Sequence, residues 1–131
     1  MDYSNYTSLK VEKKDRIAVV TVSRADIENQ IDEGLHRELE RIWKDLAGDK
    51  DVNVVMLTGV GQHFLGTAYV PWIERAILRH DRSVYRVGPA QVTGVIKDML
   101  EVPQPVIAAV NGDAWGFGAT VTLYCDFIIA A

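Results

Sequence analysis

The sequence predicts a single α/β domain, residues 1–131, in which strands alternate with helices. Two short continuous apolar runs, Val54–Leu57 and Val106–Val110, are typical of strands buried on both faces of a sheet. Ahead of the first run, apolar residues recur at helical spacing over Ile31–Leu46, and Gly48 is expected to end that helix. The chain has 131 residues, 48% of them hydrophobic and 24% charged, which is enough to bury one core. The order strand, helix, strand predicts a right-handed crossover between parallel strands.

A β-hairpin is predicted to open the fold after residues 1–8, which are expected to be flexible. Leu9–Lys13 alternates apolar and polar residues, and Ile17–Val22 is rich in β-branched residues. Lys14 and Asp15 lie between these two runs and are expected to form the turn.

Proline and glycine mark the elements of the second half. Pro71 suits the first turn of a short helix that ends near Leu78. Val84–Leu100 carries an approximate apolar stripe and predicts a long helix. Thr120–Tyr124 predicts a further helix, and Phe127–Ala131 has the composition of a buried strand.

The charge pattern and the cysteine count exclude several functional classes. The net charge is −4 with both signs interspersed, so we expect neither a nucleic-acid surface nor a membrane-binding basic patch. Cys125 is the only cysteine, which leaves no partner in this sequence for a disulfide, and no spacing is typical of a metal site. The sequence shows no signal-peptide pattern and no apolar run of membrane-spanning length, so we expect a soluble cytoplasmic protein.

The stretch Gln104–Ala131 concentrates the features that indicate chemistry. A short strand leads to a turn at Asn111 and Gly112, then to glycines 116 and 118 and a helix. The first N–H groups of a helix have no partner inside it, so such a junction can hold an anion or a developing oxyanion. The spacing fits neither the dinucleotide-binding loop nor the P-loop. The alternative is a tight turn, in which glycine permits close packing of strand and helix.

Three segments resemble the enoyl-CoA hydratase/isomerase superfamily, the crotonases. PVIAAVNGDAWGFG, Pro105–Gly118, together with Tyr124–Asp126, is similar to the core signature of that superfamily. VVMLTGVGQHF, Val54–Phe64, resembles the strand before its first oxyanion loop. Val22–Leu39 resembles its entry of strand, kink and helix, with Asn29 at the usual asparagine.

The resemblance implies a crotonase-like ββα spiral core and a coenzyme A thioester as substrate or ligand, with no other cofactor. The backbone N–H groups of Ala68 and Phe117 would form an oxyanion hole for the thioester oxygen as it becomes an enolate. By resemblance, CoA would lie along the kink and over the start of the next helix, at Ser23, Ala25, Asn29 and Val70.

The sequence departs from the family pattern inside both loops. Thr67, Ala68 and Tyr69 replace a glycine pair and an acidic residue, and Phe117 replaces the middle one of three glycines. Thr120 stands where hydratases carry their first catalytic glutamate. A neutral hydroxyl cannot act as a carboxylate base, and loss of such a group typically costs about 10²- to 10⁴-fold in rate.

The C-terminal part of the family pattern is not represented in this sequence. The second hydratase glutamate, and the helical region that completes the pocket and builds trimers, would lie beyond Ala131. We therefore expect a truncated form of the fold whose apolar edge is covered by self-association as a homo-oligomer.

Several other side chains are candidates for a functional role. Asp113 precedes the second presumed donor and is the candidate acid or base, although an aspartate after Asn-Gly often only stabilises a turn. His63 and the adjacent pair His80 and Asp81 lie in polar stretches and are better explained as solvated turns than as a catalytic dyad. Glu74 and Tyr69 are near the first loop. Three tryptophans are expected to line the core or a pocket: Trp43, Trp72 and Trp115.

Three functional hypotheses follow. The first is an acyl-CoA-binding protein of crotonase type. Whether it also has hydratase or isomerase activity through the oxyanion hole is left open by the sequence. The second is the branch of the same superfamily that hydrolyses carbon–carbon bonds of β-diketones without CoA. The third is a catalytically dead, self-associating remnant of the fold.

Overall fold

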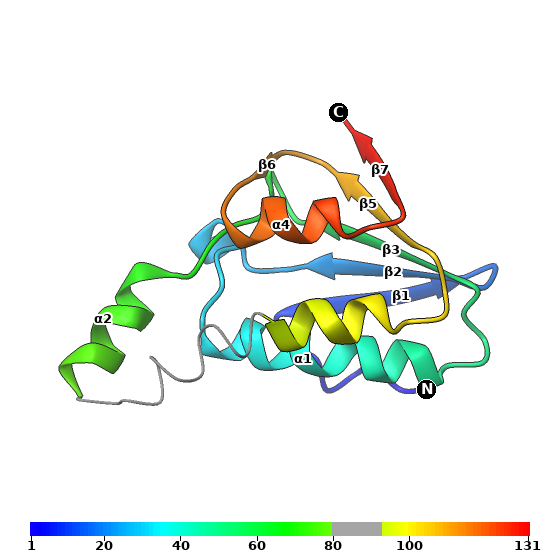
Figure 1. The fold of residues 1–131 in the computed structure, drawn as a ribbon, viewed down its shortest axis with the longest axis horizontal. Coiled ribbons are helices and arrows are strands. Elements are labelled where there is room, and N and C mark those ends of the chain that lie inside the picture. Colours follow the sequence, from blue (N-terminus) through cyan, green and yellow to red (C-terminus); the bar gives the residue numbers. More distant parts are fainter. Residues whose placement is uncertain (80–92) are drawn as a thin grey trace.

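A five-stranded sheet is at the centre of the computed structural model, which describes residues 1–79 and 93–131 (Figure 1). In order across the sheet, the strands are β1 (Leu9–Lys14), β2 (Ile17–Val22), β3 (Val54–Gly59), β5 (Val106–Val110) and β7 (Phe127–Ala130). β1 pairs antiparallel with β2, and every other neighbouring pair of this sheet is parallel. The predicted α/β class is therefore confirmed.

The opening hairpin is confirmed, with its turn one residue later than predicted. β1 extends through Lys14, and Asp15 and Arg16 take positive φ angles of 50° and 64°. Two left-handed residues in a two-residue connection match the right-handed twist of the strands on either side.

The helix α1 (Glu33–Gly48) connects β2 to β3 and covers one face of the sheet (Figure 1). It begins two residues after Ile31, because the Asp32 carboxylate accepts a hydrogen bond from the Leu35 N–H (2.9 Å) and caps the first turn. Its buried face meets the central strands in one core, made of Leu35, Leu39, Ile42, Trp43 and Leu46 with Val20, Val22, Val55 and Leu57. Each such side chain contributes about 1.5–3 kcal/mol by burial.

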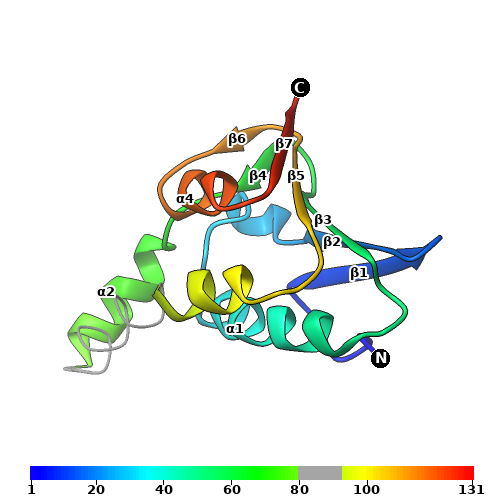
Figure 2. The same ribbon diagram turned by 45° about the vertical axis from the view of Figure 1, so that its right-hand side comes forward.

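Residues 93–100 are helical and lie beside α1 in both views (Figures 1 and 2). Val95 and Met99 join the core, and Lys44 of α1 forms an ion pair with Asp98 (3.0 Å). The predicted helix Val84–Leu100 is confirmed for this part, and its first half lies outside the described residues.

A second, two-stranded parallel sheet stands above the first and was not predicted. It pairs β4 (His63–Leu65) with β6 (Asp113–Ala114), in register His63 to Asp113 and Leu65 to Ala114. The 3₁₀ turn η1 (Ala25–Ile27) follows β2 at the kink.

Two helices follow this small sheet. The helix α2 (Val70–Leu78) has the predicted bounds, with Pro71 in its first turn, and extends away from the sheet (Figure 2). The helix α4 (Phe117–Leu123) begins three residues before the predicted Thr120. Gly116 takes a φ of 57° immediately before it, so the chain turns at the glycine and the helix starts at once.

The N-terminal segment is bound to α1, in contrast to the flexibility expected for residues 1–8. The Glu38 carboxylate accepts hydrogen bonds from three consecutive backbone N–H groups, those of Thr7, Ser8 and Leu9. The Tyr3 and Tyr6 hydroxyls donate to Asp49 (2.9 Å) and Asp45 (2.7 Å). These bonds connect residues about 30 to 46 positions apart.

The strand β7 forms the far edge of the main sheet, at the position of the C-terminus in Figure 1. Phe127, Ile128 and Ile129 are exposed on both of its faces, and Leu123 and Tyr124 at the end of α4 are exposed as well. Among the helical residues that the structure describes, none forms a span long and apolar enough for a membrane.

Candidate functional site

Two short loops leave the small sheet side by side. Because β4 and β6 are parallel, with one irregularity in register between His63 and Leu65, the segment after Leu65 and the segment after Ala114 emerge from the same end of the pair. The first carries Ala68 and leads into α2, and the second carries Phe117 and leads into α4.

The two loops are in direct backbone contact, and this contact requires glycine. A Cβ added to Gly116 would lie 2.6 Å from the Thr67 Cβ, and one added to Gly118 would lie 1.8 Å from the Leu65 carbonyl oxygen. The Gly118 N–H also donates to the Gly66 carbonyl (3.2 Å). Close packing, the alternative explanation for these glycines, is therefore confirmed. The packing sets Thr67, which precedes Ala68, against Gly116, which precedes Phe117.

The Ala68 and Phe117 N–H groups have no hydrogen-bond acceptor among residues 1–79 and 93–131. Ile31 pairs with Ala68 in a parallel bridge, in which the Ile31 N–H donates to Thr67 and the Tyr69 N–H donates to Ile31. In such a bridge the N–H of Ala68 itself points away from Ile31. Phe117 is the first residue of α4, so its N–H is free of the helix ladder. Neither of these two N–H groups is therefore used by a hydrogen bond among the described residues.

Two asparagine side chains fix the loop between β3 and β4. The fully buried Asn29 amide donates to the carbonyls of Val60 (3.1 Å) and His63 (2.7 Å), and its Oδ1 accepts from the Arg24 N–H (2.9 Å). Asn111 accepts from the Gly59 N–H (2.9 Å) and donates to the Gly61 carbonyl (2.9 Å). These bonds satisfy the loop backbone and hold β4 in place.

The segment expected to contact CoA lies along the first loop. The Gly66 N–H donates to the Asn29 carbonyl (3.0 Å), so the exit of the kink and the loop before Ala68 are hydrogen-bonded neighbours. Ser23 and Ala25 are exposed, and Val70 is 57% exposed at the start of α2. The Asn29 side chain, in contrast, is buried with its polar atoms bonded to backbone, so it shapes the kink and is not exposed for the predicted contact with CoA.

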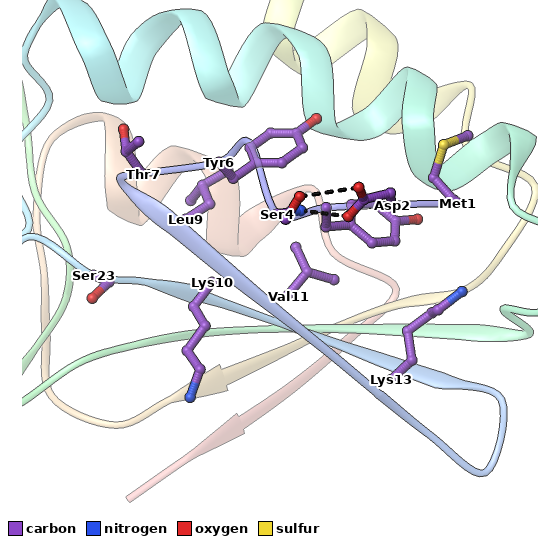
Figure 3. A pocket seen from close by; sticks show the side chains of 11 residues that line it. Met1, Asp2, Ser4, Tyr6, Thr7, Leu9, Lys10, Val11, Lys13 and Ser23 are labelled. Atoms are coloured by element: carbon purple, nitrogen blue, oxygen red, sulfur yellow. Dashed lines mark hydrogen bonds between the residues drawn. The ribbon is translucent and has the colours of Figure 1, made fainter.

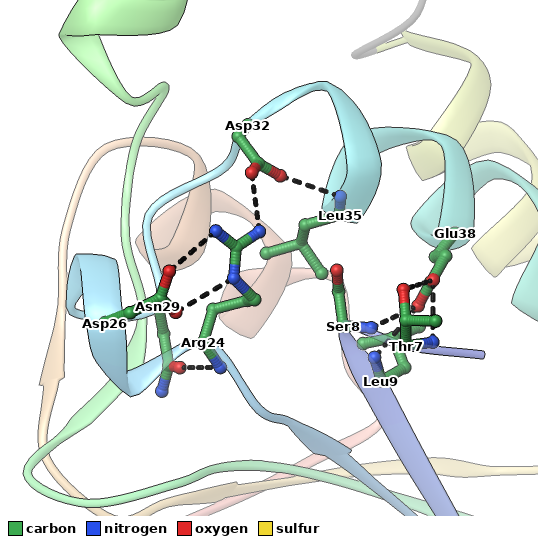
Figure 4. A network of polar contacts seen from close by, with 9 residues as sticks. All are labelled: Thr7, Ser8, Leu9, Arg24, Asp26, Asn29, Asp32, Leu35 and Glu38. Carbon is green, nitrogen blue, oxygen red and sulfur yellow. Dashed lines mark hydrogen bonds and ion pairs between the residues drawn. The ribbon is translucent and has the colours of Figure 1, made fainter.

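Arg24 holds the kink against the start of α1 (Figure 4). Its guanidinium donates to Asp26 and to the helix-capping Asp32, and these two carboxylates raise the pKa of Arg24 above its usual value. The side chain is therefore a fixed positive charge beside Ser23 and Ala25.

Asp113, the candidate acid or base, lies at the outer end of this arrangement. Its side chain is 79% exposed, and its carboxylate is 3.7 Å from the Nδ1 of His63 on the paired strand. The His63 ring meets the Trp115 indole edge-on, with 5.5 Å between ring centroids. Sequence reasoning missed this cluster, because only the β4–β6 register brings positions 63 and 113 together.

The remaining candidate side chains do not gather at one site. Thr120 is exposed, and its hydroxyl donates to the Gly116 carbonyl one turn back (3.2 Å). Burial raises the pKa of the Cys125 thiol to about 11, with Asp126 adding to the effect, so this thiol is not a reactive nucleophile. Glu74 is exposed on α2 and Tyr69 is half-buried. His80 and Asp81 lie outside the described residues.

A groove of about 550 Å³ lies elsewhere, between the N-terminal segment and β1 (Figure 3). Ser23 is the one candidate site residue that lines this groove. Lys10 and Lys13 also line it. Neither Ala68 nor Phe117 belongs to it. No group of three or more metal-binding side chains occurs within the described part of the chain.

The main sheet, the small sheet and the two loops together form the crotonase fold. An enoyl-CoA hydratase from Bacillus anthracis superposes with a TM-score of 0.82 at 28% identity, over 95% of this chain and 47% of that one. An enoyl-CoA hydratase/isomerase from Mycobacterium paratuberculosis gives a TM-score of 0.88 at 25% identity, over 98% and 51%.

The chain belongs to the enoyl-CoA hydratase/isomerase family, whose model matches residues 12–131. It is 34% identical over 118 residues to the Bacillus subtilis protein YngF, covering 90% of this chain and 44% of that protein. It is 30% identical over 122 residues to the short-chain-enoyl-CoA hydratase of Clostridium acetobutylicum, covering 92% and 45%. The chain therefore spans less than half the length of these relatives.

Proposed function

We propose that this chain binds acyl-CoA thioesters and holds the thioester oxygen with the Ala68 and Phe117 N–H groups. One observation carries the proposal: both N–H groups lack an acceptor within the described residues and belong to loops packed against each other at Thr67 and Gly116. Membership of the enoyl-CoA hydratase/isomerase family supports the ligand class.

The chemistry of such a pair is stabilisation of a developing enolate. Preorganised backbone donors contribute roughly 3 kcal/mol each at an oxyanion, because they need no reorganisation when the charge forms. The Asn29 and Asn111 bonds supply that preorganisation for the first loop by fixing β4. The CoA moiety would follow the exposed kink at Ser23 and Ala25 toward Val70.

Turnover by the described residues should be weak, because Thr120 supplies no carboxylate. Its hydroxyl is bonded to the Gly116 carbonyl, and the exposed Asp113 pairs with His63. Addition of water across an enoyl double bond needs a group that takes a proton from water and a group that returns one to carbon. We expect binding of the thioester, with hydration slower by about 10²- to 10⁴-fold than with a carboxylate base in place.

Calorimetric titration with acetoacetyl-CoA tests the proposal. Ala68→Pro deletes the donor, whereas Ala68→Ser keeps the N–H and is the matched control. We expect saturable binding by the unchanged chain and by Ala68→Ser, and binding weaker by about three- to tenfold for Ala68→Pro, which loses one hydrogen bond to the thioester oxygen. Circular dichroism checks that all three fold alike, and hydration of crotonyl-CoA in the same samples measures turnover.

The two alternatives give different outcomes in the same experiment. No binding at millimolar acetoacetyl-CoA would reject acyl-CoA binding by this chain. Turnover of a β-diketone would then support the CoA-independent hydrolase branch. Absence of both activities in an obligate oligomer would support the remnant, which the exposed residues of β7 favour.

A further inference from the structure

The Trp115 indole lies between the two candidate donor loops. A Cβ added to Gly66 would be 2.8 Å from the indole Cζ2, so the ring rests directly on the backbone of the first loop. The Trp115 N–H donates to the Leu65 carbonyl (3.3 Å). Gly66 is two residues before Ala68, and Trp115 is two residues before Phe117. The ring therefore packs the segment that carries the second donor onto the segment that carries the first.

His63 supports this indole from the side of β4. Its imidazole meets the indole edge-on, at 5.5 Å and an interplanar angle of 75°. The Asn29 amide binds the His63 carbonyl (2.7 Å), which fixes the backbone from which the imidazole projects.

The polar atoms of His63 are also constrained. Nδ1 is buried and makes no hydrogen bond within the described part of the chain. The nearest charged group is the Asp113 carboxylate at 3.7 Å, contributed by the paired strand β6. The side chain is 29% exposed. His63 thus lies against both the indole that packs on the first loop and the strand that leads into the second loop.

We propose that His63 is a positioning residue, which holds the Trp115 indole against Gly66 and so, together with the direct contacts between the loops, fixes the relative placement of the Ala68 and Phe117 N–H groups. The ligand-binding consequence rests on the proposed function, whereas the structural consequence does not. An aromatic edge contact of this kind corresponds to about a three- to tenfold change in an equilibrium constant when it is lost.

The test compares His63→Ala with His63→Gln, which restores a planar donor of similar reach toward Asp113. Gln62→Ala is the matched control, because Gln62 is the exposed neighbour on the same segment. Amide ¹H–¹⁵N spectra without ligand report on Ala68 and Phe117 directly. We expect His63→Ala to shift both signals, His63→Gln to restore them in part, and Gln62→Ala to leave them unchanged.

Affinity for acetoacetyl-CoA gives the second readout. We expect a three- to tenfold loss in His63→Ala, with partial recovery in His63→Gln. In a Trp115→Phe background the further effect of His63→Ala should disappear, since His63 acts through the indole. Unmoved Ala68 and Phe117 signals in His63→Ala, or an undiminished effect in the Trp115→Phe background, would overturn the proposal.

Failure of the proposed function is distinguishable from failure of this inference. If the unchanged chain does not bind acetoacetyl-CoA, acyl-CoA binding is rejected. The ligand-free spectra still decide whether His63 positions the two N–H groups.

Discussion

At the scale of single residues, Asn29 shows how a buried side chain can build a site without facing the ligand. It is fully buried, takes a positive φ of 54°, and bonds backbone groups of the kink and of the loop before β4. Each bond replaces one that the backbone would otherwise make to water. The kink and the loop that leads into β4 are therefore held together by this one amide.

Replacing Asn29 should destabilise the fold strongly. Asn29→Ala leaves the Val60 and His63 carbonyls unpaired and puts a Cβ-bearing residue without a polar group at a left-handed position. We expect a loss of about 2–4 kcal/mol in the free energy of unfolding, measured by urea denaturation. Asn29→Gly also removes the amide, but glycine adopts a positive φ without strain. Its loss in the free energy of unfolding should therefore be about 1 kcal/mol smaller than that of Asn29→Ala. Equal losses in Asn29→Ala and in the exposed control Asn5→Ala would contradict this assignment.

Gly116 and Gly61 form a natural matched pair for the close approach of the loops. Both have positive φ, but a Cβ on Gly116 would meet Thr67 at 2.6 Å, whereas one on Gly61 would meet nothing within 4 Å. Gly61→Ala should cost about 1 kcal/mol from backbone strain alone. Gly116→Ala should cost about 1–3 kcal/mol more, because the Thr67 contact adds overpacking. Thermal melts of the two variants measure the difference, and equal melting temperatures would count against the contact.

The residue-scale predictions from sequence were uneven, for a physical reason. Ala68 and Phe117 were identified by resemblance, and among the described residues no acceptor bonds to either of their N–H groups. The glycines were recognised locally, since a turn is a local property. The contact between His63 and Asp113 depends on pairing across the chain, and no spacing in the sequence encodes it.

At the scale of elements, Asp49 joins the N-terminal segment, β1 and the end of α1. It accepts from the Tyr3 hydroxyl (2.9 Å), the Lys13 ammonium (2.9 Å) and the Asp51 N–H (3.0 Å). Burial of the carboxyl opposes ionisation, but these three partners outweigh it and lower the pKa of Asp49 to about 2. Burial and the bond to Asp49 make the Tyr3 hydroxyl, in turn, a weaker acid by raising its pKa.

This pKa predicts an acid-dependent part of stability. The folded-state pKa is depressed, so the contribution is present above about pH 4 and is lost as the pH falls from about 4 to 2. We expect about 1–2 kcal/mol after allowing for solvent screening. Urea denaturation at pH 7 and pH 3 should show a smaller pH dependence for Asp49→Asn than for the unchanged chain. The exposed neighbour variant Asp51→Asn should behave like the unchanged chain, and an Asp49→Asn profile identical to it would refute the assignment.

Element prediction succeeded where periodicity or a terminator was strong. The α2 helix has its predicted bounds because Pro71 fixes the first turn, and β5 has them because its apolar run is closed by Asn111 and Gly112. The strand β6 has two residues, too few for any period, and it exists only because β4 pairs with it. The early start of α4 depends on the angle at Gly116, which composition does not specify.

At the scale of the whole molecule, the edge of the main sheet at β7 exposes large apolar side chains. The strand has no charged residue, and Phe127, Ile128 and Ile129 are 63%, 50% and 61% exposed. An edge strand without charge, proline or bulge offers free backbone groups to another strand. The α/β class was predicted from the sequence pattern and the spiral core from the family resemblance. That β7 is an edge strand could be known only from the strand order of the structure.

Association of the 131-residue chain should therefore depend on concentration. Sedimentation velocity over a dilution series is expected to show a larger species at high concentration. Ile129→Lys should shift the distribution to the monomer by placing a charge on the edge. Asn5→Lys adds the same charge at an exposed site remote in sequence and should have no such effect. A monomer at every concentration would count against self-association through β7.

The pairing of β4 with β6 has a consequence for the order in which the molecule is made. The paired positions His63 and Asp113 are 113 − 63 = 50 residues apart. Closing a loop of that length costs entropy before any pairing energy is gained, so the small sheet should form after the local hairpin β1–β2. On the ribosome, Ala68 emerges well before Gly116 and Phe117 do. The nascent chain should therefore bring its two loops together in one late step, when the glycine loop emerges and docks on Thr67.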